Sequence, residues 1–360
     1  MRPVYYLGIF IPIAVGLELA HASPSLIFAA SGLGVIPTAA LMSDATEQLA
    51  ARAGPGIGGL LNVTFGNAAE LIIAFFLLIE GLQEIVKASL VGSIIGNCLL
   101  VLGASMLVGG WKREKQTFSV TAAQFQAGML LLAVLVLIAP AVFELIHGGS
   151  LPSVEEERHN FGSKVEHLSI GIAIILILSY VAGLFFSLRT HKDIFNAGHG
   201  DEEEHENPWS TKKAVGLLAV AAVLVGLMSE ILVGSIEAAS DSIGLSHFFV
   251  GVFVIAIVGN AAEHYVAVVV AAKNKMDLAV NISIGSSAQI ALFVAPVLVL
   301  LSFVFGPEPM ALVFNGYELA ALLSAALIAM FLTSEGESNW FEGVQLLALY
   351  AALGLVFFFA

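Results

Sequence analysis

The pentapeptide Gly66-Asn-Ala-Ala-Glu70 returns unchanged as Gly259-Asn-Ala-Ala-Glu263, and each copy lies inside an apolar stretch. A carboxylate surrounded by hydrocarbon is costly unless it is protonated, paired or bound to a cation, so such a residue is usually functional. Here two of them occur in duplicated settings. This pattern is typical of a transporter built from two related halves with an ion site between them.

The composition predicts an all-α integral membrane protein. Of the 360 residues, 58% are hydrophobic and only 12% are charged, about half the charged fraction of a soluble domain. Apolar runs long enough to span a bilayer recur from end to end. The net charge of −14 and the lack of basic patches argue against a nucleic-acid partner. The sequence contains no P-loop, so it gives no indication that ATP is used. The single cysteine, Cys98, excludes an intrachain disulfide and is expected to be a packing thiol.

We expect eleven transmembrane helices, the first of them at the N-terminus in place of a signal peptide. Proline and glycine mark several ends, as in Gly54-Pro55-Gly56. The expected ranges are 3–20, 24–49, 56–80, 83–109, 117–146, 165–189, 211–239, 246–273, 277–305, 309–333 and 339–359.

The loop charges predict the orientation of the chain. With eleven crossings, the N-terminal side carries eleven cations and the other side three, and the positive side is cytoplasmic. The eleven are Arg2, Arg52, Lys112, Arg113, Lys115, Arg189, Lys192, Lys212, Lys213, Lys273 and Lys275, and the three are Lys87, Arg158 and Lys164. We expect a multi-pass plasma (cell) membrane protein, with its N-terminus cytoplasmic and its C-terminus outside. The absence of a long N-terminal extension favours a microbial plasma membrane over a vacuolar one.

A shift of 193 residues, the interval from Glu70 to Glu263, aligns the two halves without a gap over roughly fifty positions. Glu84 then meets Asp277, and Gly92-Ser93 meets Gly285-Ser286. Five helices separate equivalent points, so equivalent helices run in opposite directions and the repeat is inverted. The expected units are an extra helix at 1–22, a first five-helix repeat at 23–190, a cytoplasmic acidic linker at 191–210 and a second five-helix repeat at 211–360.

Helical spacing places polar residues around the two glutamates. Residues three or four apart share a helix face, and four such pairs occur. They are Asn67 with Glu70, Asn260 with Glu263, Ser93 with Asn97, and Ser286 with Gln289. Gly66 and Gly259 are expected to loosen the backbone and turn carbonyls toward the site. The faces so identified carry oxygen donors and no Cys or His.

Such a donor set suits a hard cation. Calcium accepts six to eight oxygens, and two carboxylates neutralise its charge. Manganese also tolerates oxygen, whereas zinc or copper would recruit His or Cys. Without a cation, two carboxylates facing each other in a low dielectric should take up protons. The pair is therefore predicted to form the core of a cation/proton antiporter that has no tightly bound cofactor.

These motifs carry a family resemblance. The two GNAAE motifs, each followed by a Gly-Ser-rich helix (Gly92-Ser-Ile-Ile-Gly-Asn97 and Gly285-Ser-Ser-Ala-Gln289), resemble the Ca2+/H+ antiporter family of the cation/Ca2+ exchanger superfamily. The resemblance implies export of cytoplasmic Ca2+ in exchange for H+ by alternating access, with the first helix of each repeat as the moving gate. It assigns the essential acids to Glu70 and Glu263. The supporting polar positions that it implies are Asn67, Asn260, Ser93, Ser286, Asn97 and Gln289.

Other functions stay open at this point. Na+/Ca2+ exchange would need several monovalent sites, which the scarcity of further midplane acids disfavours, and Mn2+/H+ exchange uses the same oxygens. A passive cation channel would not need an inverted repeat. The chain is not expected to be an enzyme, because Glu263-His264 lacks the second histidine of a metalloprotease motif. The oligomeric state stays open, a homo-oligomer included.

Individual residues also have simpler interpretations. Asn67 and Asn260 could cap broken half-helices, and the site serines could be interhelical hydrogen-bonding groups. Asp44 and Glu237 either line a pathway or are helix-end acids near water. The acidic run at 201–206 either serves Ca2+ or is a solvated loop.

Overall fold

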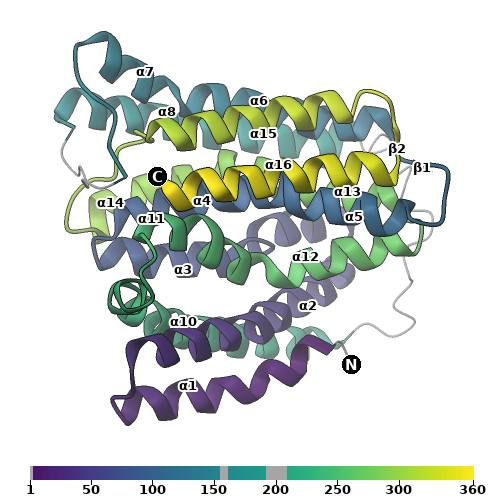
Figure 1. The fold of residues 1–360 in the computed structure, drawn as a ribbon. Helices are drawn as coiled ribbons and strands as arrows, with labels where there is room; N and C mark the ends of the chain where they lie inside the picture. The colour runs from purple at the N-terminus through teal and green to yellow at the C-terminus, as the bar shows by residue number, and fades with distance from the viewer. Residues whose placement is uncertain (1–2, 155–160, 192–208) are drawn as a thin grey trace.

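The computed structural model describes residues 3–154, 161–191 and 209–360, which form a bundle of long helices (Figure 1). The acidic run at 201–206 therefore lies outside the described residues. The helices are η1 (Pro3–Ile9), α1 (Phe10–Leu19), α2 (Pro24–Phe65), α3 (Ala68–Ile79), α4 (Gln83–Ile95), η2 (Gly96–Val101), α5 (Leu102–Gly110), α6 (Val120–Leu137), α7 (Ala139–Ile146), α8 (Ser163–Phe185), η3 (Phe186–Thr190), α10 (Thr211–Ile243), α11 (His247–Phe249), η4 (Val250–Ile255), α12 (Ala256–Ala272), α13 (Met276–Gln289), η5 (Ile290–Val294), α14 (Ala295–Phe305), α15 (Gly316–Leu332) and α16 (Trp340–Phe359). Two short strands, β1 (Gln116–Thr117) and β2 (Glu337–Ser338), pair antiparallel.

The expected membrane class is confirmed. Among the described residues, eight helical segments are long and apolar enough to cross a bilayer. Three shorter apolar segments accompany them, at Pro3–Leu19, Ala68–Ile79 and Gly316–Leu332. The outer surface of the bundle exposes many large apolar side chains, as expected where a bundle faces lipid instead of water.

The predicted helix end at Gly54-Pro55-Gly56 is wrong as a helix end, because α2 continues to Phe65. The chain nevertheless bends there. A side chain on Gly58 would collide with the backbone carbonyl of Ala50, whereas residues eight apart in a straight helix are separated by about 12 Å. The apolar span correspondingly ends at Ala53. The Gly-Pro-Gly sequence therefore produces a sharp bend within one helix.

The predicted helix at 309–333 begins later, because residues 309–315 form neither helix nor strand and end at Asn315, whose backbone is extended. Asn315 explains the late start. Its side chain accepts a hydrogen bond from the backbone N–H of Glu318, and the Glu318 carboxylate accepts one from the backbone N–H of Asn315. This reciprocal capping box fixes the first turn of α15 at Gly316.

The extended segment is buried, so its backbone groups need partners other than water. Side chains from three different helices supply them. Ser302 accepts from the N–H of Met310 at 2.8 Å, and Ser169 accepts from the N–H of Leu312 at 3.0 Å. The ammonium of Lys87 donates to the carbonyl of Val313 at 3.0 Å. The segment is thereby fixed between α4, α8 and α14.

Within the described ranges, four segments are π-helical, namely η2, η3, η4 and η5. π-helical turns inside α-helices occur frequently at functional sites. The 193-residue shift carries η2 (Gly96–Val101) onto residues 289–294, which contain all of η5 (Ile290–Val294). The two halves therefore share a backbone irregularity directly after their Gly-Ser motifs.

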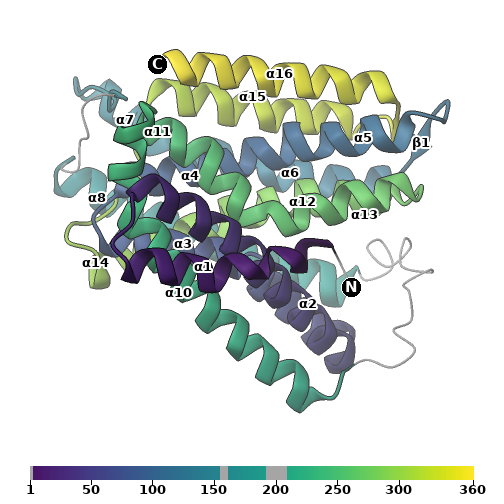
Figure 2. The same cartoon turned by 60° about the horizontal axis from the view of Figure 1, so that its bottom comes forward.

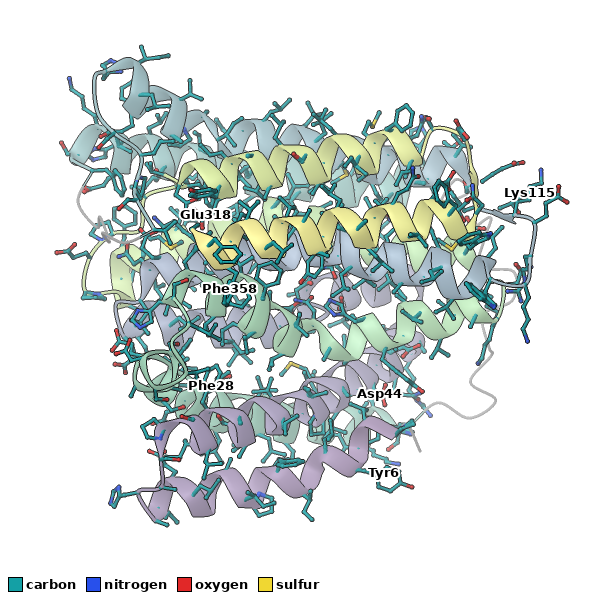
Figure 3. The ribbon with its side chains drawn as sticks, viewed as in Figure 1. Tyr6, Phe28, Asp44, Lys115, Glu318 and Phe358 are labelled. Carbon is teal, nitrogen blue, oxygen red and sulfur yellow. The ribbon has the colours of Figure 1, made fainter. Side chains whose placement is uncertain are left out.

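Helices α1, α2 and α10 lie side by side on one side of the bundle (Figures 1 and 2). The Ser25 and Ser242 hydroxyls lie 2.6 Å apart and link α2 to α10. The Tyr5 hydroxyl donates to Asp44, which is labelled on α2 in Figure 3, at 2.5 Å. Asp44 thus joins the N-terminal segment to α2, while Glu237 on α10 is exposed.

Replacing Lys87 with methionine is expected to destabilise the fold. Lys87 is 1% exposed, and its ammonium donates to Glu84 at 2.6 Å as well as to Val313. Glu318, also labelled in Figure 3, is completely buried and lies within range of the Lys87 charge. Removing one partner of a buried ion pair costs about 3–5 kcal/mol.

Thermal unfolding in detergent measures this effect. Lys87→Met should lower the unfolding temperature by several degrees, whereas Lys164→Met, at an exposed lysine, should leave it unchanged. Equal unfolding temperatures for the two variants would contradict a stabilising role of Lys87.

Candidate cation site

The two GNAAE motifs are held by different backbones. Gly66 and Asn67 form a turn between α2 and α3, and the carbonyl of Asn67 accepts from the N–H of Leu71 as the first helical bond of α3. Glu70 consequently lies in the first turn of α3, where the helix dipole favours a negative charge. The predicted loosening at Gly66 is thus observed.

In the second motif the predicted loosening is not observed. Gly259 and Asn260 lie inside the uninterrupted helix α12. The irregular backbone instead precedes the motif, in the π-helical η4. Because the two pentapeptides are identical, this difference comes from their surroundings and not from local helix propensity.

The two motifs contact each other directly. A β-carbon placed on Gly259 would lie 3.3 Å from the Cγ atom of Glu70, so the Glu70 side chain rests on the backbone of the opposite motif. Glu70 and Glu263 lie within range of each other's charge. A side chain at position 259 would force the Glu70 side chain to move away by a few tenths of an ångström.

Each motif asparagine bonds to the Gly-Ser helix of the other half. The Nδ2 atom of Asn67 donates to Oε1 of Gln289 at 2.6 Å. The Nδ2 atom of Asn260 donates to the Ser93 hydroxyl at 2.9 Å and to the carbonyl of Ala256 at 3.0 Å. Asn67 makes no capping bond with its side chain, and Asn260 lies within a helix. The capping interpretation is therefore wrong for both.

Ser286 acts on the acid itself. Its hydroxyl donates to Oε2 of Glu263 at 2.8 Å. The two matched serines thus differ, because Ser93 receives a hydrogen bond from an amide whereas Ser286 gives one to a carboxylate. A hydrogen bond to a charged acceptor is the stronger of the two kinds.

His264 is the site neighbour that the sequence did not indicate. Its Nε2 atom lies 3.1 Å from Oδ1 of Asn97. Ser93 faces Asn260 and Asn97 faces His264, so two residues four apart on one segment meet two residues four apart on the other. The expectation that the site contains no histidine is therefore wrong, because His264 lies at the edge of the site.

Three buried oxygen atoms at the centre have no hydrogen-bond partner among the described residues. They are Oδ1 of Asn67, Oε1 of Glu70 and Oδ1 of Asn260. The Asn260 amide cannot turn round without loss, because the Ala256 carbonyl only accepts hydrogen bonds and so holds the NH2 group. A buried acceptor without a partner costs about 1–3 kcal/mol. In both asparagines the NH2 group is therefore engaged in hydrogen bonds, and the side-chain oxygen is available to a cation.

This arrangement suits a hard cation. Carboxylate, amide and hydroxyl oxygens converge from both halves, and these are calcium ligands. Within the part of the chain that the structure describes, no three His, Cys, Asp or Glu side chains gather into a metal-binding group. Cys98 lies near the site but is buried, and its thiol donates to Ser287 at 3.3 Å.

The fold and this site define a membrane cation exchanger, and the chain belongs to the sodium/calcium exchanger protein family, which it matches over residues 23–189 and 213–359. The resemblance to Ca2+/H+ antiporters is confirmed by its relatives. One is the Ca2+/H+ antiporter ChaA of Bacillus subtilis (strain 168), 46% identical over 351 residues that cover 97% of this chain and 96% of that one.

Solved structures agree with the fold. The structure of native YfkE is 41% identical, with a TM-score of 0.83 over 99% of this chain and 100% of the other. The H+/Ca2+ exchanger CAX has a TM-score of 0.71 at 14% identity, covering 99% of this chain and 91% of that chain. At that identity the likeness to CAX concerns the fold alone.

The two matched serines should respond differently to mutation. Ser286→Ala removes a hydrogen bond to a carboxylate, worth about 1.5–3 kcal/mol, and should weaken Ca2+ binding roughly ten- to hundredfold. Ser93→Ala leaves Asn260 its bond to Ala256 and should weaken binding by less than about tenfold. Equilibrium binding of 45Ca2+ to purified protein measures both. A larger loss for Ser93→Ala than for Ser286→Ala would contradict this geometry.

Proposed function

We propose that the chain is a Ca2+/H+ antiporter that exports cytoplasmic Ca2+ by alternating access. The observation that carries the proposal is the set of buried, unpartnered oxygens of Asn67, Glu70 and Asn260 beside a second carboxylate, Glu263. A divalent cation would satisfy these acceptors and neutralise both charges. The names of the relatives, among them a Ca2+/H+ antiporter, favour Ca2+ and H+ as the exchanged ions.

In this mechanism the two glutamates bind either one cation or protons. With Ca2+ bound, both are ionised and ligate the metal. When Ca2+ leaves, the facing carboxylates accept protons, because two bare charges in a dry site would repel each other. Asn67 and Asn260 complete the shell with their free oxygens. Ser286 orients Glu263, and Ser93, Gln289 and Asn97 hold the asparagines and His264 in place.

The proposed architecture has eleven spans. An extra helix at 1–22 precedes two inverted five-helix repeats, 23–190 and 211–360, joined by the acidic linker 191–210. The loop charges favour a cytoplasmic N-terminus and an external C-terminus in the cell membrane. The grouping of α2 and α10 on one side of the bundle supports a moving gate made of the first helix of each repeat (Figure 2). Helix α1 packs on both and would move with them.

One uptake assay tests Ca2+/H+ exchange and distinguishes it from exchange that uses Na+ or Mn2+. Proteoliposomes with an acidic lumen should accumulate 45Ca2+, and both Glu70→Gln and Glu263→Gln should reduce uptake to background, because each removes a ligand that also carries a proton. Glu114→Gln, at an exposed loop acid, is the matched control and should transport normally.

Three outcomes would contradict parts of the proposal. Uptake driven by a Na+ gradient would show that Na+ and not H+ is the coupling ion. Preferential uptake of Mn2+ would show that Mn2+ and not Ca2+ is the substrate. Normal transport by either glutamine variant would refute the two-carboxylate site.

A further inference from the structure

Gly92 and Gly251 form a tight contact between the two halves. A β-carbon on Gly92 would collide with the backbone carbonyl of Val252 in η4. A β-carbon on Gly251 would lie 2.8 Å from Cβ of Ala88 and 3.2 Å from the carbonyl oxygen of Ile85. The backbone of η4 therefore lies directly on α4, and no side chain fits between them.

The equivalent residues of the other half make no such contact. The 193-residue shift carries Gly92 onto Gly285, Gly251 onto Gly58 and Ala88 onto Asn281. The atoms nearest to a β-carbon on Gly285 are side-chain amide atoms, of Asn281 at 3.3 Å and of Gln126 at 3.4 Å. Gly58 instead lies against Ala50 of its own helix. One half is closed backbone to backbone, and the other is covered only by side chains.

The side chains that cover Gly285 are polar. Gln126 on α6 donates a hydrogen bond to Asn281, which is exposed although it lies inside the apolar span Met276–Phe305. Next to this pair, Gly285 precedes Ser286, the hydroxyl that bonds to Glu263. Amides at this depth are tolerated where they border water instead of lipid. The Gln126–Asn281 pair thus marks an approach to Glu263.

The closed backbone contact in one half and the side-chain contact in the other correspond to the two opposite-facing states of a transport cycle. In an inverted-repeat transporter, each half adopts in one state the contacts that the other half makes in the opposite state. We propose that in the opposite state the backbone of α2 around Gly58 docks onto α13 at Asn281 and Gly285, while the contact of Gly92 with Val252 opens. This inference rests on the inverted repeat of the proposed function.

The two glycine contacts then act as seals on opposite sides of the membrane. The closed seal runs from Gly92, in the last turn of α4, back through Ala88 and Ile85 toward the start of that helix, which follows a loop expected outside. The open one runs from Gly285 back to Asn281 on α13, toward a helix start that follows a loop expected in the cytoplasm. The described state therefore admits ions from the cytoplasm. Docking of Gly58 would displace the Gln126–Asn281 pair and cover that approach.

Single alanine substitutions at the two glycines should have opposite effects. Gly285→Ala fits the described state after small movements of two amide side chains, but it prevents backbone docking. Gly92→Ala cannot form the present contact with Val252 and should favour the opposite state. Gly171→Ala on α8, away from the site, is the matched control, because a β-carbon there meets nothing within 4 Å.

The readout is the rate at which a membrane-impermeant maleimide labels Asn281→Cys from the cytoplasmic side of inside-out vesicles. The protein without this cysteine measures the background from buried Cys98. Labelling should be about tenfold or more faster with Gly285→Ala than with Gly92→Ala. Gly285→Ala should also lose pH-driven 45Ca2+ uptake while it still binds 45Ca2+ in detergent. Gly171→Ala should match the parent in both assays.

Equal labelling in the two glycine variants, or faster labelling with Gly92→Ala, would overturn the proposed seals. Normal transport by Gly285→Ala would do so even if Gly92→Ala failed to fold. Loss of pH-driven uptake in the wild type would instead refute the proposed exchange function, and the labelling contrast would stand by itself.

Discussion

Two carboxylates in the middle of an apolar bundle need a positive partner, and the structure around Glu70 and Glu263 is organised by that need. The fold places no lysine or arginine of the described residues in hydrogen-bonding contact with either acid. It supplies oxygen atoms instead, from asparagines whose NH2 groups are already engaged elsewhere. A fixed cationic side chain would neutralise the site permanently. Leaving the charge to a diffusible cation or to protons keeps the site exchangeable.

Lys87 shows the contrasting arrangement in the same membrane domain. There a buried ammonium neutralises Glu84 and also bonds to the backbone of the extended segment 309–315. The charges are fixed, so this cluster stabilises structure and has nothing to exchange. The difference between the two clusters is the source of the positive charge, since both contain two acids in a low dielectric.

The sequence predicted the central contacts because duplication and helical spacing are both local signals. The letter-for-letter repeat identified Glu70 and Glu263, and residues three or four apart identified the faces that carry Ser93 and Ser286. It missed features that depend on packing between segments. His264 contacts Asn97 one turn beyond the contact of Asn260 with Ser93, and spacing within one segment does not tell which residues of another segment it meets.

Helix ends were predicted where a cap or breaker acts alone and missed where long-range partners decide. Residues 309–315 are apolar enough for a helix, but side chains from α4, α8 and α14 satisfy their backbone in an extended form. The Gly54-Pro55-Gly56 sequence was correctly identified as a point of change. Whether it ends a helix or bends one depends on how the following residues pack.

The two identical pentapeptides indicate how the protein could change conformation during transport. Gly66 and Asn67 lie outside any helix, whereas Gly259 and Asn260 lie within α12. One sequence that adopts two backbones in one molecule has two conformations close in free energy, and the choice between them is made by contacts elsewhere. The backbone contact of η4 on α4, present in one half and absent in the other, is such a contact. If it exchanged between the halves, each motif could take the other's conformation without any change in chemistry at the carboxylates. Binding and access would then be coupled through the backbone of the motif that holds the ion.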